Sequence, residues 1–183
     1  MALGGGIWSV QNKVLPGTYI NFSSAASASA SLSERGYAAM PLMLDWGPEN
    51  EVFSVTSEEF QKNSLKLFGH LYTAPEMLPL RELFRYARTL YAFRLNGGGV
   101  KASNTYCTAK YSGTVGNKLK IVIAKNVDDD SLYDVATYYD TTRLDMQTVA
   151  AASSLQDNDF VTFTTTAALA ETASTPLTGG TNG

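Results

Sequence analysis

The fold is decided by the stretch at residues 90–99, Leu90-Tyr91-Ala92-Phe93-Arg94-Leu95-Asn96-Gly97-Gly98-Gly99. Its first six residues are apolar or aromatic apart from one arginine, and such a run predicts a strand. The asparagine and the three glycines that follow are turn formers, and they end the strand. We therefore expect one unit of the fold to close at this point.

The segment before this strand alternates predicted strands with predicted helices. A strand is expected at residues 38–44, where Pro41 indicates either the edge of a sheet or a bulge, and a second strand is expected at residues 52–55. Thr56 followed by Glu59 supplies a helix cap, and that helix should continue to about Gly69. These elements predict an α/β layer over residues 37–99.

A second helix is predicted after Pro79. Its apolar residues recur three or four positions apart, which is the spacing of one helix face. They are Met77, Leu80, Phe84, Ala87 and Tyr91.

Beyond Ala102 strands dominate. Residues 119–125 and 132–139 flank the acidic turn at residues 128–131, which predicts a hairpin, and another strand is expected at residues 160–164. A helix is expected at residues 145–155.

The first 32 residues are typical of an extended arm rather than of a domain. After Pro16-Gly17, residues 18–22 alternate in the manner of a strand, and serine and alanine then alternate from Ser23 to Ser31. We expect one strand here, formed by Thr18, Tyr19, Ile20, Asn21 and Phe22. The residues that follow it are expected to be flexible or edge-pairing backbone, beginning with Ser23, Ser24, Ala25, Ala26 and Ser27. The alternative is a disordered leader.

The charge and the cysteine count exclude several functions. The chain has 183 residues with 14 basic and 17 acidic side chains, and neither sign forms a long block. We therefore expect neither nucleic acid nor membrane as a partner. One cysteine and one histidine cannot form a zinc site, so no metal and no cofactor are expected.

No catalytic residue is predicted. His70 lacks a nucleophile elbow, and Cys107 lies in a predicted strand, where a lone cysteine usually packs as a small apolar side chain. The run at residues 97–103 lacks the spacing of a phosphate loop. Asp128, Asp129 and Asp130 do not fit the register of a calcium loop, because the sixth position is Tyr133 and the twelfth is Tyr139.

Several stretches resemble the contractile-tail sheath proteins of phages and prophages of Gram-positive bacteria. The resemblance begins at residues 3–22 with Leu-Gly-Gly-Gly and Gln-Asn-Lys-Val-Leu-Pro-Gly-Thr-Tyr-Ile-Asn-Phe. It continues at residues 35–48, 91–98 and 110–119 and at Leu177-Thr178-Gly179-Gly180. It therefore covers nearly the whole chain.

The resemblance implies a structural subunit rather than an enzyme. Such subunits form hexameric rings stacked around a tail tube and contract to drive the tube through the cell envelope. Its partners would be other copies of itself, the tube protein, and the baseplate and tail terminator proteins. Because the arms of this family add strands to neighbouring subunits, residues 18–22 would be the intersubunit strand and residues 23–27 its hinge. It would belong to the tail of a virion or a phage-tail-like bacteriocin assembled in the host cytoplasm.

An α+β organisation follows from the same resemblance. We expect an arm at residues 1–32, the first half of a sheath core domain at 33–101, a β-rich protruding domain at 102–176, and a linker at 177–183 toward a missing C-terminal half. The alternatives are another phage tail protein, from the tube or the baseplate, and a small α/β ligand-binding domain.

Overall fold

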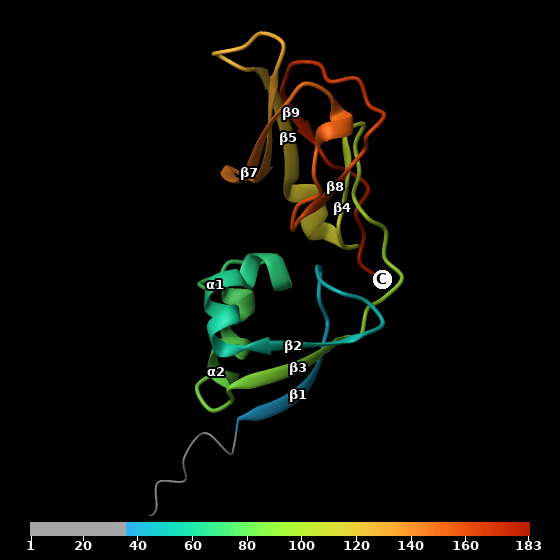
Figure 1. The fold of residues 1–183 in the computed structure, drawn as a ribbon. Coiled ribbons are helices and arrows are strands. Elements are labelled where there is room, and N and C mark those ends of the chain that lie inside the picture. Colours follow the sequence, from blue (N-terminus) through green and yellow to red (C-terminus); the bar gives the residue numbers. More distant parts are fainter. Residues whose placement is uncertain (1–35) are drawn as a thin grey trace, which may run out of the picture.

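The computed structural model describes residues 36–183. They form an α/β part up to about residue 95 and a β-rich part from about residue 100 onward (Figure 1). The α/β part contains β1 (Tyr37–Leu42), β2 (Val52–Thr56), α1 (Ser57–Phe68), the 3₁₀ turn η1 (Pro75–Met77), α2 (Leu78–Leu83) and β3 (Thr89–Arg94).

The sheet of the α/β part has three strands in the order β1-β3-β2. β1 runs parallel to β3 and β2 runs antiparallel to it. Among the described residues, β1 and β2 are therefore the two edges. The position of Pro41 in β1 confirms the predicted edge strand, because a proline removes a ladder donor.

Helix α1 begins and ends where the sequence predicts. The Thr56 hydroxyl accepts the Glu59 backbone N–H at 3.2 Å, and the Glu59 carboxylate accepts the Thr56 N–H at 2.9 Å. This capping box satisfies two donors of the helix start. Gly69 ends the helix with φ 76°, a left-handed conformation that glycine adopts without a steric penalty.

The second predicted helix is wrong in its length. Helix α2 ends at Leu83, and the chain then turns back into β3. Tyr91 lies on the exposed side of that strand, while Leu90 and Ala92 on the other side are buried. The helical spacing of Ala87 and Tyr91 was therefore coincidental, because the period of two governs residues 89–94.

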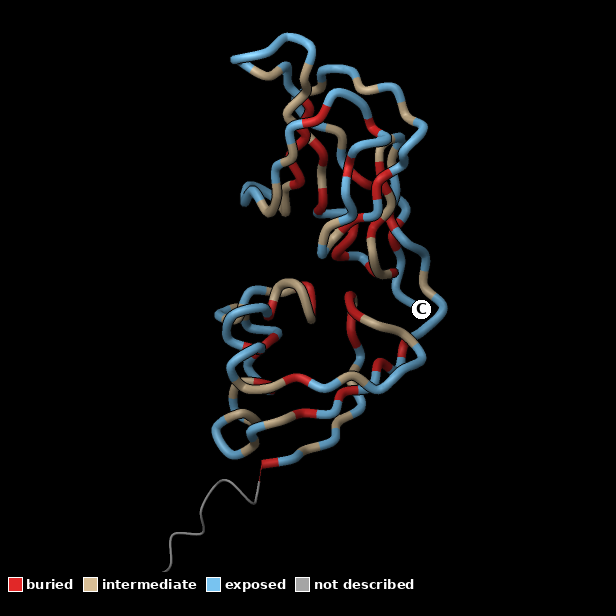
Figure 2. Tube along the Cα trace, viewed as in Figure 1, coloured by how far each residue is buried: buried red, intermediate tan, exposed pale blue. Residues whose placement is uncertain are grey.

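The helices cover one face of the sheet. Phe60 and Phe68 of α1 and Leu80 of α2 pack against the buried side chains of β2 and β3. Phe60 lies at the centre, with its ring stacked on Phe84 at 4.9 Å between centroids. Figure 2 shows this buried group apart from a second one in the β-rich part.

The β-rich part contains two sheets. A four-stranded sheet has the order β7-β6-β5-β9, and β4 pairs with β8 in a second sheet. The elements are β4 (Cys107–Ala109), η2 (Thr114–Lys118), β5 (Leu119–Lys125), β6 (Tyr133–Tyr139), β7 (Thr142–Val149), η3 (Ala152–Ser154), β8 (Val161–Phe163) and β9 (Thr172–Pro176). The predicted β5–β6 hairpin is confirmed, as is the strand at residues 160–164.

The helix predicted at residues 145–155 is wrong. Residues 142–149 form β7, which pairs with β6 along its length, and only a 3₁₀ turn follows. The pairing includes an irregularity beside Thr137, which disturbs the alternation of β7. Because of that irregularity, the sequence of β7 does not show the regular alternation by which a strand is predicted.

The core of the β-rich part lies between its two sheets. Ile121, Ile123 and Val135 from the larger sheet meet Cys107 and Val161 from the smaller one. All are at most 2% exposed. The α+β class predicted from the sequence is thus confirmed, while the expected arm lies outside the described residues.

Candidate functional site at the joint between the two parts

Trp46 joins the α/β part to the β-rich part. It follows β1 in the sequence, yet its fully buried side chain packs in the core of the β-rich part. Its ring meets Tyr111 edge to face at 5.3 Å, and its Nε1 donates to the Lys66 carbonyl of α1 at 3.0 Å. One side chain therefore contacts both parts.

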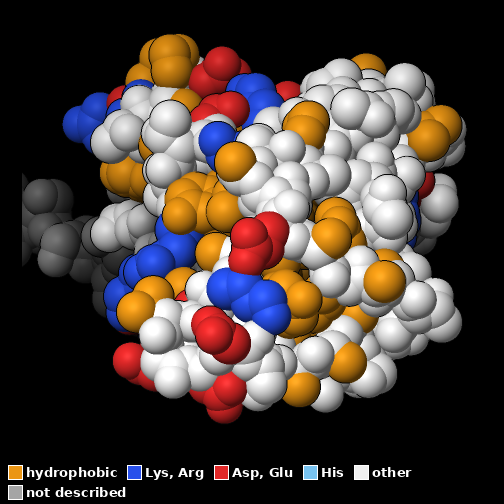
Figure 3. All heavy atoms as spheres, turned by 90° about the horizontal axis from the view of Figure 1, so that it is seen from above, with side chains coloured by type: hydrophobic (Ala, Val, Ile, Leu, Met, Phe, Trp, Pro, Cys, Tyr) orange, Lys and Arg blue, Asp and Glu red, His pale blue; other side chains and the backbone are white. Residues whose placement is uncertain are grey.

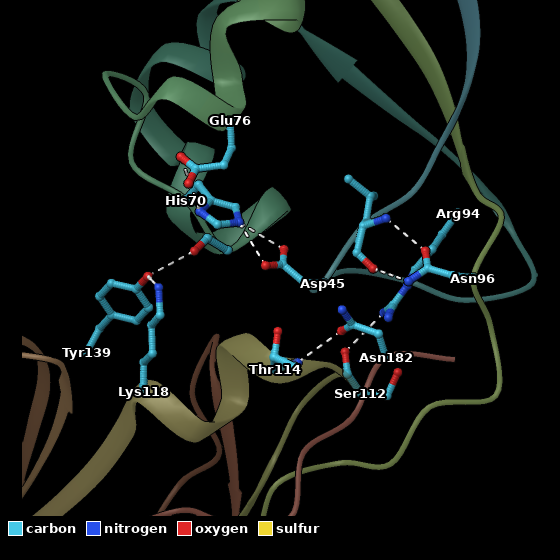
Figure 4. Close-up of polar contacts among 12 residues, drawn as sticks. Asp45, His70, Glu76, Arg94, Asn96, Ser112, Thr114, Lys118, Tyr139 and Asn182 are labelled. Atoms are coloured by element: carbon cyan, nitrogen blue, oxygen red, sulfur yellow. Dashed lines mark hydrogen bonds and ion pairs between the residues drawn. The ribbon is translucent and has the colours of Figure 1, made fainter.

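Arg94, at the end of β3, makes a second connection. Its guanidinium is buried, and Nη1 donates to the Gly47 carbonyl at 3.1 Å. The same nitrogen donates to the Ser112 carbonyl at 3.0 Å (Figure 4). The Glu49 carboxylate lies 3.5 Å from the same nitrogen. Burial lowers the pKa of Arg94, and the charges of Glu49 and Asp45 oppose that shift. A paired, buried arginine fixes these three segments against one another.

Asn96 closes the end of β1 against the end of β3. Its side-chain oxygen accepts the Leu44 N–H at 2.8 Å, and its side-chain nitrogen donates to the Leu44 carbonyl at 2.5 Å. The side-chain amide thus makes with Leu44 the two hydrogen bonds that a further paired residue of the sheet would make. Asn96 is buried, so both of its bonds form away from water.

His70 lies in a structural position at the same joint. Its Nε2 is 2.9 Å from an oxygen of Asp45, and its Nδ1 is 4.0 Å from Glu76. Its hydrogen-bond partner among the described residues is a carboxylate, not a hydroxyl or thiol nucleophile. Next to it, the Tyr139 hydroxyl donates to the Gly69 carbonyl at 3.2 Å (Figure 4).

The chain enters and leaves the β-rich part at neighbouring points. Val100 and Thr181 exchange backbone hydrogen bonds of 3.1 and 3.0 Å, and Ser103 pairs with Thr178 in the same way. The Asn182 side-chain oxygen accepts the Thr114 N–H at 3.0 Å. Residues 177–183, the expected linker, therefore lie along residues 100–103, and Leu177 is fully buried.

A pocket of about 510 Å³ opens beside the end of β1. Its apolar lining includes Met40, Met43 and Met77, and its acidic residues are Asp45 and Glu76. No lysine or arginine lines it. The pocket is therefore an apolar hollow with an acidic rim.

The outer face of the three-stranded sheet is uncovered among the described residues. Tyr37, Tyr91, Phe93 and Val52 lie on this face, with between 37% and 73% of each exposed. The rings of Tyr37 and Tyr91 stack at 6.2 Å. Such a contiguous aromatic surface is typical of a binding face.

The other candidate residues have structural surroundings. Burial raises the pKa of the Cys107 thiol to about 12, so its reactive thiolate form is suppressed at neutral pH. Asp129 caps the β5–β6 turn by accepting the Ser131 N–H and hydroxyl, which lowers its pKa. Residues 97–103 lead into the β-rich part and form no phosphate loop with a helix behind it.

The described residues 36–183 hold no group of three or more metal-ligating side chains. Within the same range, no helix has both the length and the apolarity needed to cross a bilayer. Seen from the β-rich end, basic and acidic side chains lie close to one another, and neither sign forms an extended surface (Figure 3).

The predicted intersubunit residues are not placed by the structure. Thr18–Phe22 and the hinge residues 23–27 lie outside the described range. Sequence reasoning missed Arg94 and Trp46 as the residues of the joint. For Arg94 a signal existed, because the alternation of β3 puts it on the same side as the buried Leu90 and Ala92.

Two family models match adjacent stretches of the chain. Residues 35–95 match the tail sheath protein Gp18 domain III N-terminal region. Residues 97–182 match the phage tail sheath protein beta-sandwich domain. The two matches correspond to the α/β part and the β-rich part described above.

Curated relatives agree with these matches. The phage-like element PBSX protein XkdK of Bacillus subtilis is 39% identical over 181 residues, covering 96% of this chain and 38% of the relative. The uncharacterized protein YqbK of the same organism is 38% identical over 178 residues, covering 92% and 36%. The chain thus spans about two fifths of the length of both relatives.

Two crystal structures share the fold. The sheath tail protein of Desulfitobacterium hafniense superposes with a TM-score of 0.73 at 36% identity, covering 91% of this chain and 39% of that one. The sheath tail protein Lin1278 of Listeria innocua gives 0.73 at 35% identity, covering 83% and 37%. Family matches, relatives and fold all agree, and the chain belongs to the phage tail sheath protein family.

Proposed function

We propose that this chain is part of a structural subunit of a contractile tail sheath, in a phage or a phage-tail-like bacteriocin. The subunit polymerises around the tail tube and contracts to drive the tube through the cell envelope. The observation that carries the proposal is the pair of adjacent sheath-family matches over residues 35–95 and 97–182. The joint supports a mechanical role, because Trp46, Arg94 and Asn96 bond to backbone groups of other segments rather than converge on a substrate site.

The same proposal assigns a role to each segment. Residues 33–101 form the first half of a core domain, and residues 102–176 form a protruding domain. Residues 177–183 return toward the core, supported by the pairing of Thr181 with Val100. No catalysis and no cofactor are involved, and the partners are other copies of the subunit, the tube, the baseplate and the tail terminator.

Assembly uses the arm. The edges at β1 and β2 carry backbone groups that no strand among the described residues pairs on their outer sides. An added strand satisfies such groups, which is how an extended segment binds a sheet edge. We assign Thr18–Phe22 to this role, with residues 23–27 as the hinge that lets the arm reach a neighbouring copy.

The first test compares the chain with a version extended to the length of the curated relatives, using the remaining sequence of the PBSX protein. Light scattering and negative-stain microscopy should show rings or tubes for the extended version and small species for the chain alone. An extended protein that stays monomeric at every salt concentration would overturn the proposal.

A matched pair of prolines tests the arm. In the extended protein, Ile20→Pro removes a donor from the predicted strand and should abolish the rings and tubes, because proline cannot donate to a ladder. Ala26→Pro, in the hinge, should leave assembly intact. Equal assembly of the two variants would contradict the role given to Thr18–Phe22.

A further inference from the structure

The pocket beside the end of β1 is suited to an apolar segment that carries a positive charge. Its volume of about 510 Å³ lies within the range of sites that bury small ligands. Methionines such as Met40, Met43 and Met77 adapt their shape to what they contact. Asp45 is already bonded to His70 Nε2 at 2.9 Å, whereas the Glu76 carboxylate is 57% exposed and lies 4.0 Å from His70 Nδ1. Glu76 is therefore the rim carboxylate that is open to a further cation.

The N-terminal segment of this chain has the complementary composition. Lys13 is the only charged side chain among residues 1–33. It stands within Ile7-Trp8-Ser9-Val10-Gln11-Asn12-Lys13-Val14-Leu15, which carries five large apolar side chains. An apolar anchor in a hollow, with opposite charges at the rim, is the usual pattern of a specific contact.

The position of the pocket fits the path of the arm. Met40 and Leu42 line it from β1, the open edge to which we assign the predicted strand Thr18–Phe22. If that strand runs antiparallel to β1, Thr18 lies at the Leu42 end, beside the pocket. Pro16-Gly17 is a pair typical of turns, so a change of direction there is what the contact with the pocket requires.

We propose that this pocket binds residues Ile7–Leu15 of a neighbouring copy, with Lys13 beside the exposed Glu76 carboxylate. The inference rests on the proposed arm exchange and adds an anchor to it. The added strand supplies backbone hydrogen bonds, and the pocket supplies the side-chain contacts that fix its register. Pockets beside an added strand generally provide specificity in this way.

Site-directed cross-linking tests the contact. One full chain carries Leu15→Cys and another carries Met43→Cys, and they are mixed under mild oxidation. Cys107 does not compete, because it is buried and its pKa is raised to about 12. The mixture should give roughly tenfold more heterodimer than Leu15→Cys mixed with Val127→Cys, because docking raises the local thiol concentration. Val127 is 96% exposed at the distant β5–β6 turn.

Equal yields at Met43 and Val127 would overturn the proposal. So would a disulfide that forms only within a Leu15→Cys/Met43→Cys chain, because the pocket would then hold its own arm. A charge exchange adds a second readout. Lys13→Glu should lower the heterodimer yield several-fold, and Glu76→Lys in the partner should restore that yield. Glu82→Lys in the partner is the control and should not restore it. Any other pattern of yields counts against the contact.

The cross-link and the assembly are separate measurements. If the extended protein forms tubes while Met43 gives no specific cross-link, the pocket contact is wrong and the sheath proposal stands. If the cross-link appears while the extended protein stays monomeric, the contact is real and the sheath proposal fails.

Discussion

Gly69 is a residue of the joint whose replacement should be poorly tolerated. Its φ of 76° lies in the left-handed region, and a Cβ built there would lie 2.6 Å from Trp46 Cβ and 2.8 Å from Val115 Cγ2. Its carbonyl also accepts the Tyr139 hydroxyl. One glycine thus ends α1 and allows the β-rich part to approach.

Gly69→Ala should lower the free energy of unfolding by about 2–4 kcal/mol, since backbone strain and overpacking add. Gly98→Ala is the matched control, because Gly98 has a similar φ of 85° but nothing within 4 Å of an added Cβ. It should cost about 1 kcal/mol. Urea unfolding of the two variants measures the difference, and equal losses would show that the close packing at Gly69 is unimportant.

At the scale of the element, the stabilisation that the N-terminal cap gives to α1 depends partly on pH. The Thr56 backbone N–H and hydroxyl bind the Glu59 carboxylate and hold its pKa below the ordinary value of 4.5. The folded state therefore favours the charged form. This stabilisation is present above about pH 4.5 and is lost as the pH falls through the lowered pKa.

Thr56→Ala should lower the free energy of unfolding by about 1 kcal/mol at pH 7. The difference in unfolding free energy from the wild type should become smaller below about pH 4.5, because protonated Glu59 accepts the Thr56 hydroxyl more weakly than the carboxylate does. Urea titrations at pH 7 and pH 3.5 give both values. Ser57→Ala, at the next residue, is the control and should change the free energy of unfolding by less than about 0.5 kcal/mol at either pH. A stability difference between Thr56→Ala and the wild type that grows in acid would contradict the pH-dependent contact between Thr56 and Glu59.

The elements differ in how far the sequence predicts them. Helix α1 was predictable because its cap at Thr56 and its stop at Gly69 are local signals. The end of α2 was not, since helical spacing persists through Ala87 and only the pairing of β3 with two strands overrides it. Strand β7 depends in the same way on pairing with β6, a non-local contact.

At the scale of the whole molecule, the joint should make the two parts unfold together. Trp46, Arg94 and Tyr139 each bond or pack across it, and the Lys66–Asp159 ion pair also crosses it at 2.8 Å. The ion pair is about half exposed and contributes little. The coupling therefore lies mainly in the buried residues.

Trp46→Ala should lower the opening free energies of β3 and β5 by a similar amount, about 3–5 kcal/mol, because a large buried side chain is lost from a shared unit. Hydrogen exchange with mass spectrometry reads both strands in one experiment. Tyr86→Ala, at a residue that is 72% exposed, should change neither strand. Loss of protection in only one strand would show that the two parts open independently.

The joint was harder to predict than either part. Trp46 is followed by Gly47-Pro48, a pair typical of turns, but nothing local indicates that Trp46 packs into a core formed by residues beyond 100. The sequence did predict that Cys107 lies in a strand and packs as a small apolar side chain. Residues within one element are therefore predictable here, whereas contacts between the parts require the fold.

The side-by-side entry and exit of the β-rich part determine how it responds to force. If the chain is pulled at Gly99 and Gly183 in opposite directions, the Val100–Thr181 bonds carry the load first and the Ser103–Thr178 pair only afterwards. Bonds loaded one after another break at low tension, as in a zipper. A pull along β5 and β9 instead loads their ladder all at once, so the same domain is compliant at its base and stiff along its length.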